Sequence, residues 1–244
     1  MSFRQDFTFS RFVRTPSSAA AWRLALAVAE GRADAPRVLL FHGPSGTGKT
    51  HLLHAIAHTT AARTAAAQIR TVAASDLSSQ LVAGLRSDQV AALHRVYADI
   101  DLLLIDDLHA LVDKPGTQAE IGRHLRAWTE SGVRIVAASG VPPGQLVYLT
   151  RELQTIPFVT WVRLKRGSEG ETRRLALVLL ARQAVVVRPT LLDRLVRQSR
   201  GDVRRLIGAA TFFATRPRQP RAKTGPPWLA GRRRSTHPVD PLLD

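Results

Sequence analysis

The sequence has no cysteine, which excludes disulfide bonds and thiolate metal sites. No apolar run approaches the roughly 20 residues of a membrane-spanning helix, and residues 1–6 hold no signal-peptide core. We therefore expect a cytoplasmic protein without a membrane span. Acids are also scarce, since 35 Lys and Arg stand against 19 Asp and Glu, a net charge of +16. Such an excess favours a polyanionic partner, nucleic acid or an anionic membrane surface, over the alternative of a basic proteome or a basic tail.

Apolar runs alternate with helical patterns over the first two thirds of the chain. Buried strands are expected at 37–42, 68–73, 101–106, 133–139 and 159–164. Helices are expected at 17–30, 49–66, 76–86, 88–97 and 117–130, the third of them capped by Asp76. Strands that alternate with helices predict an α/β fold, with a parallel sheet covered on both faces.

After Gly167 the pattern changes to helices alone, at 169–184, 189–199 and 202–214. We therefore expect three parts: a core over residues 1–166, a small all-helical lid over 167–214, and a basic tail over 215–244. From Arg216 onward the tail has six prolines and no acid before Asp240. This composition is typical of disorder.

A glycine-rich loop is the strongest chemical signal. Its pattern, G-x-x-x-x-G-K-[ST], is complete and lies between an expected strand and an expected helix. Glycines let backbone N–H groups surround phosphates, the lysine supplies a cation, and the last hydroxyl ligates magnesium. We therefore predict binding of ATP or ADP with Mg²⁺ by Gly43, Pro44, Ser45, Gly46, Thr47, Gly48, Lys49 and Thr50.

The apolar run 102–105 ends in two acids, Asp106 and Asp107. In phosphate-loop enzymes an acid at the end of a buried strand holds the magnesium ion. Asp106 is the candidate for that role beside Thr50, and Asp107 is the candidate for positioning the attacking water. Without the glycine-rich loop, the same pattern would be read as an ordinary strand end.

Three further polar positions carry a weaker signal. Ser139 ends the next strand and could reach the γ-phosphate, but a solvated serine explains it as well. Arg204 begins a helix of the lid, and the pattern alone favours a solvated charge. His51, His54 and His58 share one helix face and are interpreted as packing or surface residues.

Taken together, these segments resemble the AAA+ ATPase domain of the bacterial DnaA/Hda family over about residues 7–213. The resemblance implies a five-stranded AAA+ core with a helical lid, and it makes Arg204 the lid arginine that contacts ATP. It also implies an adenine pocket near Phe12 and Val13, and it counts His51 with the nucleotide-binding residues. The matching segments are Phe7–Val13, 43–56, Asp101–Leu111, Thr117-Gln118, Ile135–Ser139 with Pro142-Pro143, Glu171–Arg173 and Asp202–Leu206.

The sequence also departs from that family. Segments resembling the helix-turn-helix domain and the helicase-loading domain of the initiator are not found, nor is a clamp-binding peptide in residues 1–6. Gly140 stands where the family has an acid after Ser139. The arginine that acts on a neighbouring subunit aligns with Ile156 or Pro157, and Arg151 is the nearest substitute. Hydrolysis and nucleotide-dependent self-association are therefore open.

The resulting interpretation is a DnaA/Hda-like ATP-binding protein in replication initiation or its regulation, with weak or partner-stimulated ATPase activity. Its expected partners are DnaA or another AAA+ protein, and single-stranded or non-specific DNA held by the basic tail. One alternative is a nucleotide-gated adaptor that does not hydrolyse ATP. A further alternative is a helicase loader of the DnaC type, which shares the core.

Overall fold

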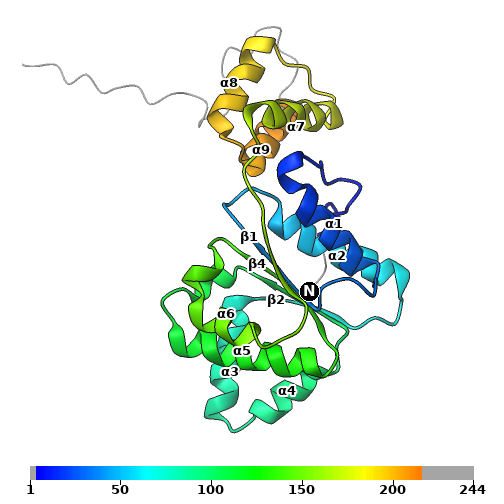
Figure 1. Cartoon of the computed structure of the whole chain (residues 1–244). Helices are drawn as coiled ribbons and strands as arrows, with labels where there is room; N and C mark the ends of the chain where they lie inside the picture. Colours follow the sequence, from blue (N-terminus) through cyan, green and yellow to red (C-terminus); the bar gives the residue numbers. More distant parts are fainter. Residues whose placement is uncertain (1–3, 216–244) are drawn as a thin grey trace, which may run out of the picture.

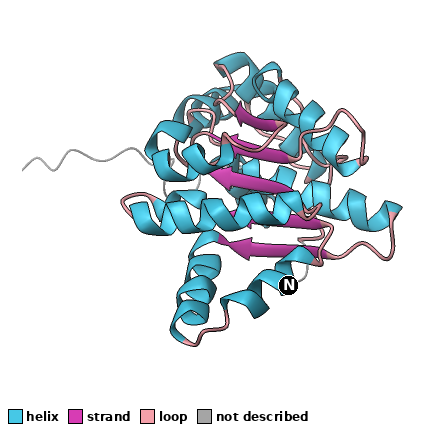
Figure 2. Cartoon of the chain, turned by 60° about the horizontal axis from the view of Figure 1, so that its bottom comes forward, coloured by secondary structure: helices cyan, strands magenta, loops and turns pink. Residues whose placement is uncertain are grey.

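The computed structural model describes residues 4–215 and contains one five-stranded parallel sheet (Figure 2). The strand order is β2-β3-β4-β1-β5, with β2 and β5 at the two edges of the sheet. Each connection between strands that follow one another in the sequence contains a helix. All five predicted strands are confirmed, with ends that differ by a residue. The strands are β1 (Val38–His42), β2 (Ile69–Ala73), β3 (Leu102–Asp106), β4 (Arg134–Ser139) and β5 (Val159–Arg163).

Helices cover both faces of the sheet (Figure 2), and a further group lies beyond its edge (Figure 1). Short 3₁₀ turns also occur at η1 (Pro16–Ser18), η2 (Leu108–Leu111) and η3 (Pro143–Gln145). The helices are α1 (Ala19–Ala29), α2 (Lys49–Arg63), α3 (Ala74–Arg86), α4 (Val90–Ala98), α5 (Pro115–Glu130), α6 (Val147–Leu153), α7 (Glu169–Arg182), α8 (Pro189–Ser199) and α9 (Val203–Thr215).

Each central strand is apolar along its whole length because both of its faces are buried. In β3, Leu103 and Ile105 pack with the cluster beneath α3, α5 and α6. Leu102 and Leu104 of the same strand pack with the opposite cluster, beneath α1 and α2. Side chains alternate along a strand, so an unbroken apolar run fills both clusters at once.

Two details of the sequence prediction are wrong. Helix α3 begins at Ala74, so Asp76 lies inside its first turn and is not the capping residue. Helix α6 was not predicted between the fourth and fifth strands. It has only seven residues, and Leu149 and Leu153 are fully buried against the core. A helix this short depends on tertiary packing, which a local pattern does not reveal.

Helices α7, α8 and α9, which we call the lid, pack on one another at the end of the segment that leaves β5 (Figure 1). Their shared apolar cluster is small and includes Leu175, Leu192 and Leu206. That the lid forms a unit of its own, with the boundaries given above, stays a prediction. Nearly all of the predicted tail, residues 216–244, lies outside the described residues.

Candidate nucleotide-binding site

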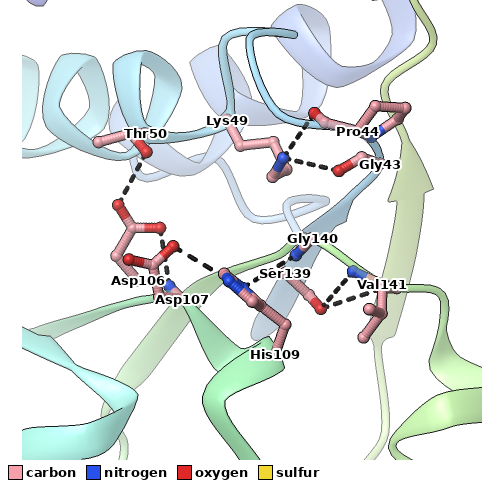
Figure 3. Close-up of polar contacts among 10 residues, drawn as sticks. All are labelled: Gly43, Pro44, Lys49, Thr50, Asp106, Asp107, His109, Ser139, Gly140 and Val141. Atoms are coloured by element: carbon pink, nitrogen blue, oxygen red, sulfur yellow. Dashed lines mark hydrogen bonds and ion pairs between the residues drawn. The ribbon is translucent and has the colours of Figure 1, made fainter. Parts of the chain in front are cut away.

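The glycine-rich loop joins β1 to α2 at the carboxyl edge of the sheet (Figure 3). Gly46 and Gly48 have φ values of 77° and 98°, in the left-handed region that side chains disfavour. Gly48 also packs closely, because a methyl carbon there would lie 2.8 Å from Cε2 of Phe12. The two glycines therefore satisfy a backbone requirement, and α2 begins directly at Lys49 with its free N–H groups facing the loop.

Lys49 points back into the loop that precedes it (Figure 3). Its Nζ donates to the carbonyl oxygens of Gly43 and Pro44, at 2.7 and 2.9 Å. Burial lowers the pKa of Lys49, the carboxylates of Asp106 and Asp107 partly offset this, and the charge of Arg204 lowers the pKa further. The ammonium is thus held by weak neutral acceptors, which an anionic phosphate would replace favourably.

Thr50 and Asp106 meet across the gap between α2 and β3 (Figure 3). The Thr50 hydroxyl donates to Oδ2 of Asp106 at 2.8 Å, and Oδ1 of the same carboxylate accepts the Asp107 N–H at 2.8 Å. A hydroxyl and a carboxylate are the hard oxygen ligands that Mg²⁺ prefers. The pair predicted as metal ligands therefore fits a magnesium ion, and it lies beside Lys49.

Asp107 follows Asp106 in a left-handed backbone conformation, with φ of 57°. Its side chain is exposed, and Oδ1 lies 3.8 Å from Nδ1 of His109. The same Nδ1 accepts the Gly140 N–H at 3.3 Å (Figure 3). His109, which the sequence analysis did not single out, thus lies between the predicted water-positioning acid and the end of β4.

Ser139 lies at the end of β4, which pairs with the strand that leads into the loop. Its side chain bonds to the backbone of nearby Val141. Its hydroxyl donates to the Val141 carbonyl at 2.9 Å and accepts the Val141 N–H at 3.1 Å (Figure 3). Both functions of the hydroxyl are therefore used locally. A contact between Ser139 and a phosphate stays a prediction and would require this turn to open.

A pocket lies beside the loop, between the segment before α1 and the lid. Phe12 and Val13, the two residues implied as the adenine pocket, both line it, as does His51. The lid contributes Leu175 and Ile207. Mostly apolar walls next to a phosphate loop suit a flat base attached to a polyphosphate.

His51 also anchors the segment before α1. Its Nε2 is 2.8 Å from the Thr8 carbonyl oxygen, and its ring stacks on Phe7 with a centroid distance of 4.7 Å. His54 contacts Phe7 edge-on, and His58 bonds the Arg4 carbonyl. The shared helix face is thus a packing surface, as expected, and its partner is the start of the described chain.

Glu171 has a role that the sequence analysis missed, although it quoted the residue in the family resemblance. It lies in the first turn of α7 and is buried, yet its carboxylate accepts the N–H groups of Ser17 at 2.9 Å and Ser168 at 2.7 Å. Burial raises the pKa of Glu171, but these hydrogen bonds outweigh it, and the net pKa is lowered. One carboxylate therefore ties the lid to the beginning of α1.

The start of α9 reaches the phosphate loop itself. The Val203 N–H donates to the Gly46 carbonyl at 2.9 Å, so the lid and the loop share a backbone hydrogen bond. Arg204, the predicted lid arginine, is exposed, and its charge is felt at Lys49. A contact between the Arg204 side chain and a bound phosphate stays a prediction.

The residues aligned with the trans-acting arginine lie elsewhere. Ile156 is buried in the cluster beneath α5 and α6, while Pro157 is exposed. Arg151 is exposed on α6. The only cation in this stretch is therefore on a helix surface, away from the loop of its own chain.

This arrangement defines the class: a phosphate-loop α/β domain of the AAA+ type, with a five-stranded parallel sheet and a helical lid. Among residues 4–215, no helix combines the length and the apolar character that crossing a membrane requires. Residues 3–159 match the family model described as the bacterial DnaA ATPase domain. The chain belongs to this family.

Individual relatives agree with that assignment. The chromosomal replication initiator protein DnaA of Deinococcus radiodurans is 33% identical over 204 residues, which cover 83% of this chain and 44% of the relative. The corresponding DnaA of Thermus thermophilus is 31% identical, with 83% and 47% covered. The chain thus spans less than half the length of these relatives.

Solved structures show the same fold. Domain III of the Thermotoga maritima replication initiation protein DnaA superposes with a TM-score of 0.75 at 25% identity, covering 87% of this chain and 89% of that one. A replication initiator DnaA bound to AMPPCP and single-stranded DNA superposes with a TM-score of 0.74 at 22% identity, covering 86% and 65%.

Proposed function

We propose that this chain binds ATP and ADP with Mg²⁺ in the pocket beside the phosphate loop. The carrying observation is that Thr50, Asp106 and Lys49 converge at the loop although they come from two separate elements. Lys49 would face the β- and γ-phosphates, the hydroxyl and carboxylate would hold the ion, and Phe12 and Val13 would contact the base. The structure of a related DnaA with AMPPCP supports this proposal.

Lys49→Ala tests the proposal directly. Losing a charge-assisted contact, worth about 1.5–3 kcal/mol, should weaken ATP binding by more than tenfold in titration calorimetry. Lys114→Ala is the matched control, because it removes the same charge from an exposed residue at the start of α5 that does not line the pocket. Equal ATP affinity in Lys49→Ala and the parent would refute the proposal.

Hydrolysis is a separate step of the proposal. Asp107 is exposed next to the metal-ligand pair and has His109 as its neighbour, a position suited to orienting a water. Asp107→Asn should therefore keep ATP affinity and lower phosphate release. A parent protein that binds ATP but releases no phosphate, alone or with single-stranded DNA, would instead favour the adaptor.

The wider role that we propose is replication initiation or its regulation, through contact with DnaA, another AAA+ protein or DNA. Family membership and the initiator DnaA relatives support this role. The absence of the trans-acting arginine, whose aligned position is Ile156 or Pro157, favours the non-hydrolysing adaptor, whereas the intact pair Asp106-Asp107 favours an ATPase. This chain should capture purified DnaA in the presence of ATP, and its Lys49→Ala variant should not.

DNA binding through residues 216–244 is the remaining part of the proposal. Seven cations precede His237 in a stretch without acids. Cations that contact phosphates give strong salt dependence, with a log–log slope of about −0.7 per contact on single strands. Deleting residues 216–244 should weaken DNA binding and flatten that slope, with ATP affinity unchanged. Equal DNA affinity at equal salt would move the nucleic-acid site to the described part of the chain, where Arg86 and Arg95 are exposed.

A further inference from the structure

The lid touches the phosphate loop at the junction between α8 and α9. Helix α8 ends at Ser199, and the next two residues, Arg200 and Gly201, are both left-handed, with φ of 50° and 74°. Gly201 is buried, and a methyl carbon there would lie 3.0 Å from the Gly167 carbonyl oxygen. The chain is therefore turned tightly against the start of the lid, and this turn delivers Asp202 to the loop.

Asp202 lies against Gly46. A methyl carbon built on Gly46 would overlap the Asp202 carboxylate, so only a glycine in the loop allows the acid to approach this closely. The neighbouring Val203 N–H donates to the Gly46 carbonyl at 2.9 Å and fixes the contact. A carboxylate is thus held beside a loop whose predicted ligand is a polyphosphate anion.

Asp202 also has an ordinary structural task, which must be separated from any other. Its Oδ1 accepts the N–H of Arg204 at 2.9 Å and of Arg205 at 3.3 Å, which caps the start of α9. Asparagine caps a helix about as well as aspartate. Replacing Asp202 by asparagine therefore preserves the cap and removes only the charge.

The lid brings charges of both signs to the same loop. Arg204, two residues after Asp202, is close enough for its charge to lower the pKa of Lys49. Arg204 attracts a phosphate anion, whereas the charge of Asp202 opposes one. With the lid docked as seen here, the balance between the two depends on how much negative charge the ligand adds.

We propose that Asp202 is a specificity-determining residue that weakens nucleotide binding through its charge, and weakens ATP more than ADP. This inference rests on the proposed binding of nucleotide at the loop. ATP carries one more negative charge than ADP and meets a larger repulsion from the same carboxylate. Asp202 thereby opposes the Arg204 contact and favours the ADP-bound protein when the lid is docked.

The test is a comparison of ATP and ADP affinities in the full chain and in Asp202→Asn, by titration calorimetry at low and high salt. Asp202→Asn should bind ATP about three- to tenfold more tightly and gain less for ADP, and the gain should shrink as salt screens the charge. Asp99→Asn is the matched control, because it makes the same charge change at the exposed end of α4. It should change neither affinity.

Three outcomes would overturn the inference. Equal affinities in Asp202→Asn and the parent would leave Asp202 as a helix cap only. Weaker ATP binding in Asp202→Asn would show that the carboxylate supports the nucleotide. A gain of the same size in Asp99→Asn would make the effect one of net charge. A parent that binds neither nucleotide would instead contradict the proposed function, a result that Lys49→Ala identifies independently.

Discussion

The sheet with its covering helices and the lid are held together in different ways. Two large apolar clusters fill both faces of the sheet, with most of their members completely buried. The lid has a small cluster, and several of its members keep some exposure. Its links to the rest of the protein include single polar contacts, those of Glu171 to Ser17, Val203 to Gly46, and Arg182 to the carbonyls of Arg11 and Ser10.

The sheet and the lid therefore differ in how strongly they are held in place. Burial of apolar surface is non-directional and strong, so the sheet forms a fixed base for the loop. Single hydrogen bonds contribute about 0.5–1.5 kcal/mol each, a range that ligand binding can readily exceed. We therefore expect the lid to shift relative to the sheet more readily than the sheet itself deforms.

The largest expected effect comes from one substitution made in both regions. Leu104 is fully buried in β3, and Leu192 lies in the lid cluster at 5% exposure. Leu104→Ala should lower the free energy of unfolding by about 2–5 kcal/mol, because the central sheet cannot collapse around the cavity. Leu192→Ala should cost less and should loosen α8 before the sheet unfolds. Denaturant unfolding with hydrogen exchange measures both, and equal costs in a single transition would contradict the comparison.

A smaller effect is expected from Glu171→Gln, which weakens the clamp between the lid and the start of α1. Loss of charge-assisted bonds to two N–H groups should cost about 1–3 kcal/mol, seen as faster exchange of the Ser17 and Ser168 amides. Glu169→Gln is the control, because Glu169 is exposed in the same first turn. Similar exchange rates in the two variants would show that the carboxylate is not a clamp.

The same clamp should respond to acid. The pKa of Glu171 is lowered in the folded protein, so its contribution is complete above the ordinary value near 4.5 and is lost as the pH falls through the folded pKa. In Glu171→Gln this part of the pH dependence should disappear. Titration of the Ser17 amide exchange between pH 6 and pH 3 measures it.

The smallest effect concerns His51 and His54 on α2. Burial lowers the pKa of both, so the folded protein favours their neutral forms. Their contribution to stability is present above the ordinary value near 6.5 and decreases as the pH falls through the lowered folded pKa. The melting temperature should be lower at pH 5.5 than at pH 7.5, and this difference should be smaller in His51→Gln. An unchanged pH dependence in that variant would exclude His51 as its source.

Local patterns were sufficient for much of the fold. The apolar runs at Leu102–Ile105 and Val38–Phe41 are short and bounded by turn signals or acids, which favours strands buried on both sides. The ends of all five strands agree with the prediction to within a residue. The start of α3 was wrong because a possible capping residue, Asp76, was preferred over the backbone that follows β2 directly. Helix α6 was missed because its stability comes from Leu149 and Leu153 inside the core.

The residues of the site also differ in whether the sequence could predict them. Loop chemistry could be predicted because the spacing of Gly43, Gly48, Lys49 and Thr50 is itself the requirement for surrounding a phosphate. The meeting of Thr50 with Asp106 follows from the neighbouring places of β1, β4 and β3 in one parallel sheet. The contacts of His109 with Asp107, of Glu171 with Ser17 and of Asp202 with Gly46 were not predicted. The capping-box spacing of Ser168 and Glu171 could have indicated the start of α7, but not the contact with Ser17.

The sequence by itself determined the class of fold, the phosphate loop and the pair of acids at the end of β3, because these depend on the order of residues within a few turns of chain. Only the tertiary structure decided what the lid contacts. The contacts of Glu171 with Ser17 and of Val203 with Gly46 join segments more than 150 residues apart. Such contacts arise where separate packed surfaces happen to bring hydrogen-bond donors, acceptors and charges together, and no local periodicity encodes that meeting.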